Sequence, residues 1–141
     1  MSGTVSVPIK VQDGFQLPFV VTAANPVTLG QVVELYSDGT VFPATTSSTR
    51  VVGAAYLANR ITHDQTDNTI AAGLYVTVVT RGVCNLTIGS GVTLAAGDIV
   101  AAYSTGRVGG SAAYGDRIGK CLVGGTGDAS GTVYATVLLN I

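Results

Sequence analysis

The sequence predicts an all-β chain that forms a small β-barrel or β-tulip-like domain from two similar β units, with an extended N-terminal arm. Three observations support this fold class. No window of a dozen residues keeps its apolar residues at helical spacing. Glycine, present 19 times, interrupts the chain throughout together with threonine, valine and serine, which is typical of strands joined by tight turns. Several segments alternate apolar and polar residues, the pattern of a strand with one buried face.

The first alternating segment lies near the N-terminus. Val5, Val7, Ile9 and Val11 are separated by polar residues and by Pro8. Because proline has no N–H to donate to a β-ladder, Pro8 favours a sheet edge or an extended arm. The alternation leaves three partners open for this segment: the chain's own barrel, a sibling subunit or another protein.

The remaining strands follow in order, bounded by turn signals. We expect them at 16–22, 31–36, 51–58, 73–81, 83–88, 98–103, 117–123 and 132–139. The turns between them are predicted at Ser37-Asp38-Gly39, Gly89-Ser90-Gly91, Thr105-Gly106 and the glycine-rich segment 124–131. We divide the chain into an arm with the first strand, 1–25, and a single barrel-like domain, 26–141.

The chain also resembles itself. Segment 29–41 recurs as 96–108, and the two are identical at Gly30/Gly97, Val33/Val100, Tyr36/Tyr103, Ser37/Ser104, Gly39/Gly106 and Val41/Val108. In the same order, 52–57 matches 118–123 and 73–78 matches 132–137. These matches predict pseudo-repeats at about 29–80 and 96–139. Each consists of a strand entered from glycine, a tight hairpin, a strand with a central glycine and a long alternating strand.

The composition argues against several partners. Seven Lys and Arg residues, scattered singly, nearly balance eight Asp and Glu, so we expect no nucleic-acid binding. No run of apolar residues is long enough for a membrane span. The N-terminus has no signal-peptide pattern, so we expect synthesis in the cytoplasm. Because only 11% of the residues are charged and 47% are hydrophobic, part of the surface is expected to contact other protein.

The residues that could support catalysis or metal binding form no recognisable site. His63 lies beside Asp64 and Asp67, but the spacing fits no calcium loop, and a solvated loop is the better interpretation. Cys84 and Cys121 lie far apart with no metal-ligand spacing, so we expect buried free thiols. No nucleophile elbow or phosphate-binding loop is present. We therefore expect no enzyme activity, no catalytic residues, no metal and no cofactor.

Taken together, these elements resemble the tailed-bacteriophage capsid decoration proteins, also called cement proteins. The resemblance covers most of the chain from about Gly30 onward, and its order is more informative than any single element. It rests on segments 5–11, 30–33, 52–55, 78–83, 96–100, 118–121 and 133–140.

The resemblance implies a structural virion protein without catalytic residues. Such a protein binds the outer surface of a mature phage head, often as a homotrimer, and stabilises the capsid by bridging neighbouring major capsid proteins. In several relatives the N-terminal segment adds a strand to the shell, a role that would fall on Val5, Val7, Pro8, Ile9 and Val11. Strand addition gives affinity through main-chain hydrogen bonds, and Pro8 would remove one of them.

A second hypothesis is a virion- or cell-surface β-domain that binds a receptor or a carbohydrate. Such a module needs an exposed aromatic or polar pocket. Because the chain has no tryptophan, its six tyrosines would have to supply the aromatic surface.

Overall fold

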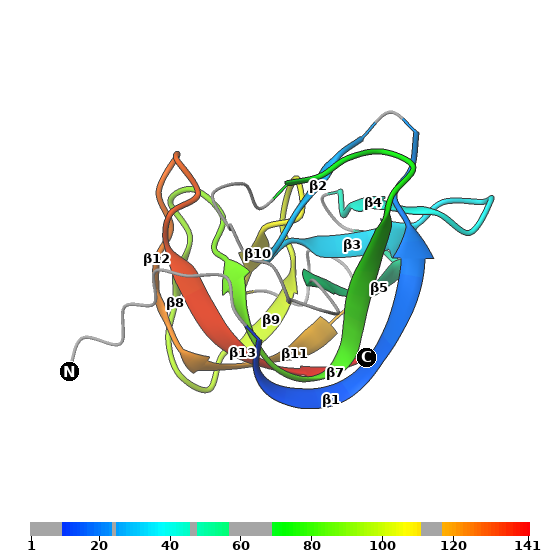
Figure 1. Cartoon of the computed structure of the whole chain (residues 1–141). Coiled ribbons are helices and arrows are strands. Elements are labelled where there is room, and N and C mark those ends of the chain that lie inside the picture. Colours follow the sequence, from blue (N-terminus) through cyan, green and yellow to red (C-terminus); the bar gives the residue numbers. More distant parts are fainter. Residues whose placement is uncertain (1–9, 24, 46–47, 57–68, 111–116) are drawn as a thin grey trace.

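In the computed structural model, residues 10–23, 25–45, 48–56, 69–110 and 117–141 are described. These residues form strands and turns and no helix, which confirms the all-β prediction. The strands, shown in Figure 1, are β1 (Lys10–Val20), β2 (Val27–Thr28), β3 (Val32–Leu35), β4 (Val41–Pro43), β5 (Val51–Tyr56), β6 (Thr69–Ile70), β7 (Tyr75–Thr87), β8 (Thr93–Leu94), β9 (Ile99–Ala102), β10 (Val108–Gly109), β11 (Arg117–Val123), β12 (Gly125–Thr126) and β13 (Tyr134–Asn140).

One curled antiparallel sheet organises the molecule. Its strands follow the order β10-β9-β11-β13-β7-β5-β3-β4. A ninth strand, β1, pairs with β7 but is not part of this linear order. Two further pairs, β2 with β6 and β8 with β12, form separate two-stranded ribbons. Figure 1 shows the long strands β1, β7 and β13 curving around the molecule. This arrangement confirms a small β-barrel-like domain.

Two of the predicted strands are a single strand. The segments expected at 73–81 and 83–88 form β7, which continues through Gly82. Gly82 stays in register, paired with Leu139 of β13, and has φ +137°. An isolated glycine therefore alters the local backbone without ending the strand, because its neighbours keep their ladder partners.

The glycine-rich segment 124–131 is also more than a loop. Gly125–Thr126 forms β12, which pairs with β8. The turn itself is shorter and is held by Asp128, whose carboxylate accepts hydrogen bonds from the Thr132 N–H at 2.9 Å and from the Thr132 hydroxyl. These bonds lower the pKa of Asp128 below its ordinary value.

The two similar units predicted from the sequence share one pairing scheme. We call residues 10–80 the first unit and residues 81–140 the second unit. The first contains the order β4-β3-β5-β7 and the second contains the order β10-β9-β11-β13. The ribbons correspond as well, since β2 and β6 occupy the same places in the first unit as β8 and β12 in the second.

The registers of the two units agree residue by residue. In both units the register shifts beside a central glycine, which is Gly53 of β5 in the first unit and Gly119 of β11 in the second. A Cβ at Gly53 would lie 2.3 Å from the carbonyl oxygen of Val79, and one at Gly119 would lie 2.1 Å from that of Leu138. Both central glycines are therefore required by a close approach of the neighbouring backbone. The matching pairs are Val32↔Ala54 with Ile99↔Lys120, Val33↔Gly53 with Val100↔Gly119, and Glu34↔Val51 with Ala101↔Arg117.

The correspondence extends upstream of the repeat seen in the sequence. β1 has the same position in the first unit as the end of β7 has in the second. Beyond these strands, a parallel bridge joins Val21 to Val41, and its counterpart joins Ile88 to Val108. In each unit, the residue that follows the first strand therefore pairs with the hairpin of the same unit. β7 belongs to both units, because it pairs with β1 and β5 as well as with β13.

Two apolar clusters follow from this arrangement. One fills the first unit and contains Val21, Val27, Leu29, Val33, Val41, Ala55, Val76 and Val78. The other contains the equivalent residues of the second unit, among them Ile88, Leu94, Val100, Cys121 and Val137. It also contains residues of β3, β5 and β7 from the first unit, including Val32, Ala54, Tyr56 and Val79. The interior of the second unit thus packs against the face of the first unit that carries Val32, Ala54, Tyr56 and Val79, which we call the outer face.

Candidate interaction surface

The predicted capsid-binding arm is only partly within the described residues. Val11 lies in β1, whose backbone pairs with the chain's own β7 from Lys10↔Cys84 onward. Val5, Val7, Pro8 and Ile9 lie outside the described residues. The role of the arm in binding another protein stays a prediction.

No metal site emerges from the described residues. Across 10–23, 25–45, 48–56, 69–110 and 117–141, no cluster of three or more His, Cys, Asp or Glu side chains could hold a metal ion. The same ranges contain no helix long and apolar enough to cross a membrane. The candidates His63, Asp64 and Asp67 lie outside these ranges.

The two cysteines are buried, and neither forms a disulfide. Both are paired with Val137, Cys84 from β7 and Cys121 from β11. Because β13 runs between them, they cannot form a disulfide without moving a strand. Burial raises the pKa of the Cys121 thiol, which keeps it protonated and unreactive.

Glu34 is a buried carboxylate with a structural role. Its Oε1 accepts hydrogen bonds from the Thr45 N–H at 2.7 Å and from the Thr45 hydroxyl at 2.9 Å. These bonds hold the chain that leaves β4 against β3. The equivalent position in the second unit is Ala101, which makes no such contact. Glu34 therefore distinguishes the two units without forming part of a catalytic pair.

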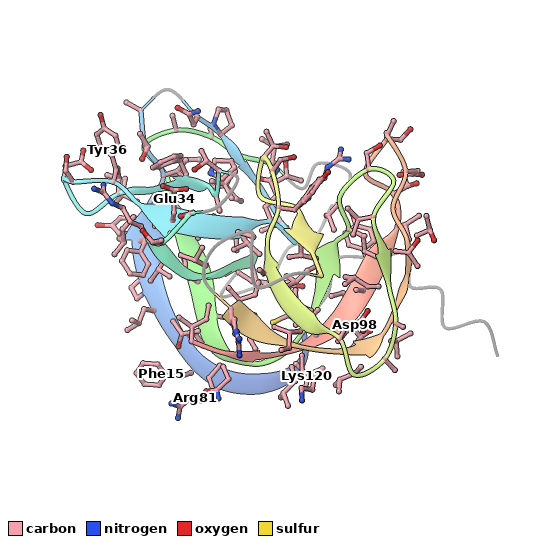
Figure 2. The ribbon with its side chains drawn as sticks, turned by 180° about the vertical axis from the view of Figure 1, so that it is seen from behind. Phe15, Glu34, Tyr36, Arg81, Asp98 and Lys120 are labelled. Carbon is pink, nitrogen blue, oxygen red and sulfur yellow. The ribbon has the colours of Figure 1, made fainter. Side chains whose placement is uncertain are left out.

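A groove of about 750 Å³ opens at one end of the first unit. Its apolar lining includes Phe15, Tyr36 and Ile141, which are 58%, 51% and 41% exposed. Arg50 and Arg81 also line it. Figure 2 shows Phe15 and Arg81 close together along the outer edge of the molecule. Exposed apolar side chains grouped in a groove indicate a surface that binds another molecule.

Sequence reasoning missed this groove. Phe15, Tyr36 and Ile141 come from β1, the end of β3 and the C-terminus. No local pattern joins them. One signal was available, because the repeat places Tyr36 and Tyr103 at equivalent positions, and Tyr103 is more buried than Tyr36.

A second geometric feature is the contact between the two units. The N–H of Val32 donates to the carbonyl oxygen of Gly106 at 2.7 Å, and the N–H of Gly106 donates to that of Ala44 at 2.8 Å. The side-chain amide of Gln31 donates to Thr105 at 3.1 Å. The Tyr56 hydroxyl donates to the carbonyl oxygen of Asn85. The hairpin tip of the second unit is thus hydrogen-bonded to the first unit at the outer face.

No protein-family model and no curated protein sequence matches the chain. Among solved structures, the chain is similar to the N base of the head fibre protein gp8.5 of bacteriophage phi29, with a TM-score of 0.54 and 12% sequence identity. The similarity covers 90% of this chain and 98% of that chain. The chain therefore shares the fold of the base of a phage head fibre over nearly the whole length of both.

Proposed function

We propose that the chain is a structural protein of a phage head. It binds the outer surface of the mature head as a homotrimer and stabilises the capsid by bridging neighbouring major capsid proteins. The observation that carries this proposal is the fold shared with 98% of the phi29 head-fibre base. The neighbour's printed description as the base of a head fibre supports a role in attachment for this chain.

The character of the surface supports the proposal. Large apolar side chains are exposed at Phe15, Tyr36, Leu122, Leu138 and Ile141. Only 11% of the chain is charged. A surface of this kind loses unfavourable contact with water when other protein subunits cover it. Many copies on one head would each contribute such a contact.

The N-terminal segment supplies the proposed capsid contact. Alternate apolar residues at Val5, Val7 and Ile9 suit a strand added to the edge of a capsid sheet. β1 begins at Lys10 and is held by β7. We therefore expect replacement of the three apolar residues by serine to leave the described sheet intact.

Co-sedimentation with expanded heads that lack the protein tests this proposal. The unmodified chain is expected to bind at a fixed copy number and to raise the temperature at which the heads release DNA. The variant with Val5, Val7 and Ile9 replaced by serine is expected to lose binding while its own melting temperature is unchanged. Leu74→Ser, at a 56% exposed residue outside the arm, serves as the matched control. Full binding by the triple variant would contradict the role of the arm, and no binding by the unmodified chain would contradict the function.

Receptor or carbohydrate binding has weaker support. The groove offers the aromatic rings of Phe15 and Tyr36, and its polar side-chain groups are the Tyr36 hydroxyl, Thr80 and two arginines. A sugar site needs several convergent donors and acceptors to fix the orientation of the ligand. We therefore favour a protein partner for the exposed surfaces.

A further inference from the structure

The outer face of the first unit packs against the second unit. Val32, Ala54 and Val79 are cross-strand neighbours on this face, and each is 0% exposed. Tyr56 lies on the same face and is 4% exposed. They belong to the same apolar cluster as the interior of the second unit.

The equivalent face of the second unit is open. Its cross-strand neighbours are Ile99, Lys120 and Leu138, with Leu122 two residues further along β11. Leu122 is 43% exposed and Leu138 is 45% exposed, whereas the residues that they replace, Tyr56 and Val79, are buried. Two leucines therefore lie in water at positions where the first unit makes its main internal contact.

The opposite half of the contact is also present twice. From the second unit, Ala102, Ile118 and Leu139 belong to the same apolar cluster as the outer face and are 0%, 0% and 1% exposed. Their equivalents in the first unit are Leu35, Val52 and Thr80, and these line the open groove together with Phe15 and Ile141. The chain thus contains one contact between its two units. The groove of the first unit and the open face of the second unit are equivalent to the two sides of that contact, and both are exposed.

From this we propose that the groove of one copy binds the outer face of the second unit of another copy, so that the chains join head to tail. Leu122 and Leu138 of one chain would fill the groove beside Phe15 and Tyr36 of the next. This inference rests on the self-association included in the proposed function and names the two surfaces that produce it. Figure 2 shows Tyr36 and Lys120 well apart, so a single chain cannot bring its own two surfaces together.

The free hairpin of the first unit supports the same docking. Inside the chain, the tip residue Gly106 accepts a hydrogen bond from Val32. The equivalent tip residue, Gly39, is exposed, and no neighbouring atom lies within 4 Å of the position that a Cβ would occupy there. The shared register directs the N–H of Ile99 away from β11, as it directs that of Val32 away from β5. A neighbouring Gly39 can therefore take the place that Gly106 has within the chain.

The charges at this contact are complementary. The two sides of the internal contact carry neutral residues at two positions, Thr105 at the tip and Ala54 on the outer face. Their counterparts are Asp38 at the free tip and Lys120 on the open face. Asp38 is exposed and its carboxylate accepts hydrogen bonds from the Thr40 N–H at 3.0 Å and the Thr40 hydroxyl at 2.6 Å. Head-to-tail docking would place this anion and the Lys120 ammonium on the two facing surfaces, which favours the correct partner.

A contact between two different surfaces is heterologous, and such contacts form a closed ring or an open filament. The internal contact is itself heterologous, because the second unit docks on the first without a reciprocal bond from Gly39 in the described residues. A ring of three copies would continue the same contact around six units, which is compatible with the proposed homotrimer.

Light scattering on the purified chain tests the inference. The unmodified chain is expected to form a discrete oligomer or filament, while Phe15→Asp blocks the groove and Leu122→Asp blocks the open face. Each variant alone is expected to be monomeric. An equimolar mixture is expected to form dimers, because one intact groove and one intact face remain. Leu74→Asp, at an exposed residue of neither surface, is the control and should keep the oligomer.

Three results would overturn the inference: a monomeric unmodified chain, variants that keep its mass, or a mixture that stays monomeric. A charge exchange gives a second measure if an aspartate variant folds poorly. Asp38→Lys and Lys120→Glu are each expected to weaken association about tenfold, and the double variant is expected to restore it. Failure of the double variant to recover would argue against the contact.

Head binding distinguishes this inference from the proposed function. A chain that is monomeric in solution but binds heads contradicts the head-to-tail contact and leaves the function standing. A chain that forms the expected oligomer but ignores heads supports the contact and contradicts the function.

Discussion

The two units have the same strand pairing, but equivalent residues differ in their exposure to solvent. Val79 and Leu138 occupy equivalent positions beside the central glycines, yet Val79 is 0% exposed and Leu138 is 45% exposed. Glu34 is buried and bonded to Thr45 in one unit, and alanine takes its place in the other. The comparison shows that alternation and glycine placement set the hydrogen-bond ladder, whereas the packing of one unit on the other sets which face is buried.

The largest expected difference comes from placing a charge at these equivalent positions. Val79→Asp would bury an unpaired carboxylate and is expected to destabilise the fold by more than about 4 kcal/mol. In solutions dilute enough to keep the chain monomeric, Leu138→Asp leaves the carboxylate in water and is expected to change stability by less than about 1 kcal/mol. Urea unfolding of the two variants measures both values. Equal losses would mean that the open face is covered within a single chain.

The central glycines test whether the two units share one backbone geometry. Gly53→Ala and Gly119→Ala each place a Cβ against a carbonyl oxygen of the next strand, at 2.3 Å and 2.1 Å. Because backbone on a central strand cannot move aside cheaply, each variant is expected to lose about 2–3 kcal/mol. Thermal unfolding monitored by circular dichroism would report similar losses. Full stability of one variant would show that the registers of the units differ there.

The smallest effect is expected at the free hairpin. Hydrogen bonds from Thr40 lower the pKa of Asp38 below its ordinary value of 3.8. The Asp38 contribution is therefore present above pH 3.8 and is lost as the pH falls through the lower pKa of the folded state. Asp38→Ala is expected to melt slightly below the unmodified chain at neutral pH and equally with it in strong acid. Asp128, which is held in the same way by Thr132, remains in both proteins and cancels from the difference.

A lower melting temperature for Asp38→Ala that persists in strong acid would assign the effect to the turn backbone instead. The second hairpin offers the comparison, because Thr105 occupies the position of Asp38 and adopts φ +46° while docked on the first unit. A direct NMR titration of Asp38 would confirm the direction of its pKa shift.

Much of the fold could be predicted from the sequence. β11 begins and ends where the alternation does, at Arg117 and Val123. The hairpins at Gly39 and Gly106 form where glycine permits positive φ, +86° and +77°. The short ribbons β2–β6 and β8–β12 could not be predicted, because two-residue strands carry no periodic signal. The continuity of β7 was missed because an isolated glycine alone does not show whether the strand continues in register on both sides.

The sequence by itself determined the all-β class and the existence of two similar units, because alternation, turn glycines and the internal repeat are local properties of the chain. Only the tertiary structure decided which of two equivalent surfaces is buried between the units and which is exposed. Burial of Val79 and exposure of Leu138 depend on which unit lies against which, and the groove depends on β1, β3 and the C-terminus meeting in space. Two equivalent sequences can have opposite environments because a heterologous contact always leaves one half unpaired at each end of the chain.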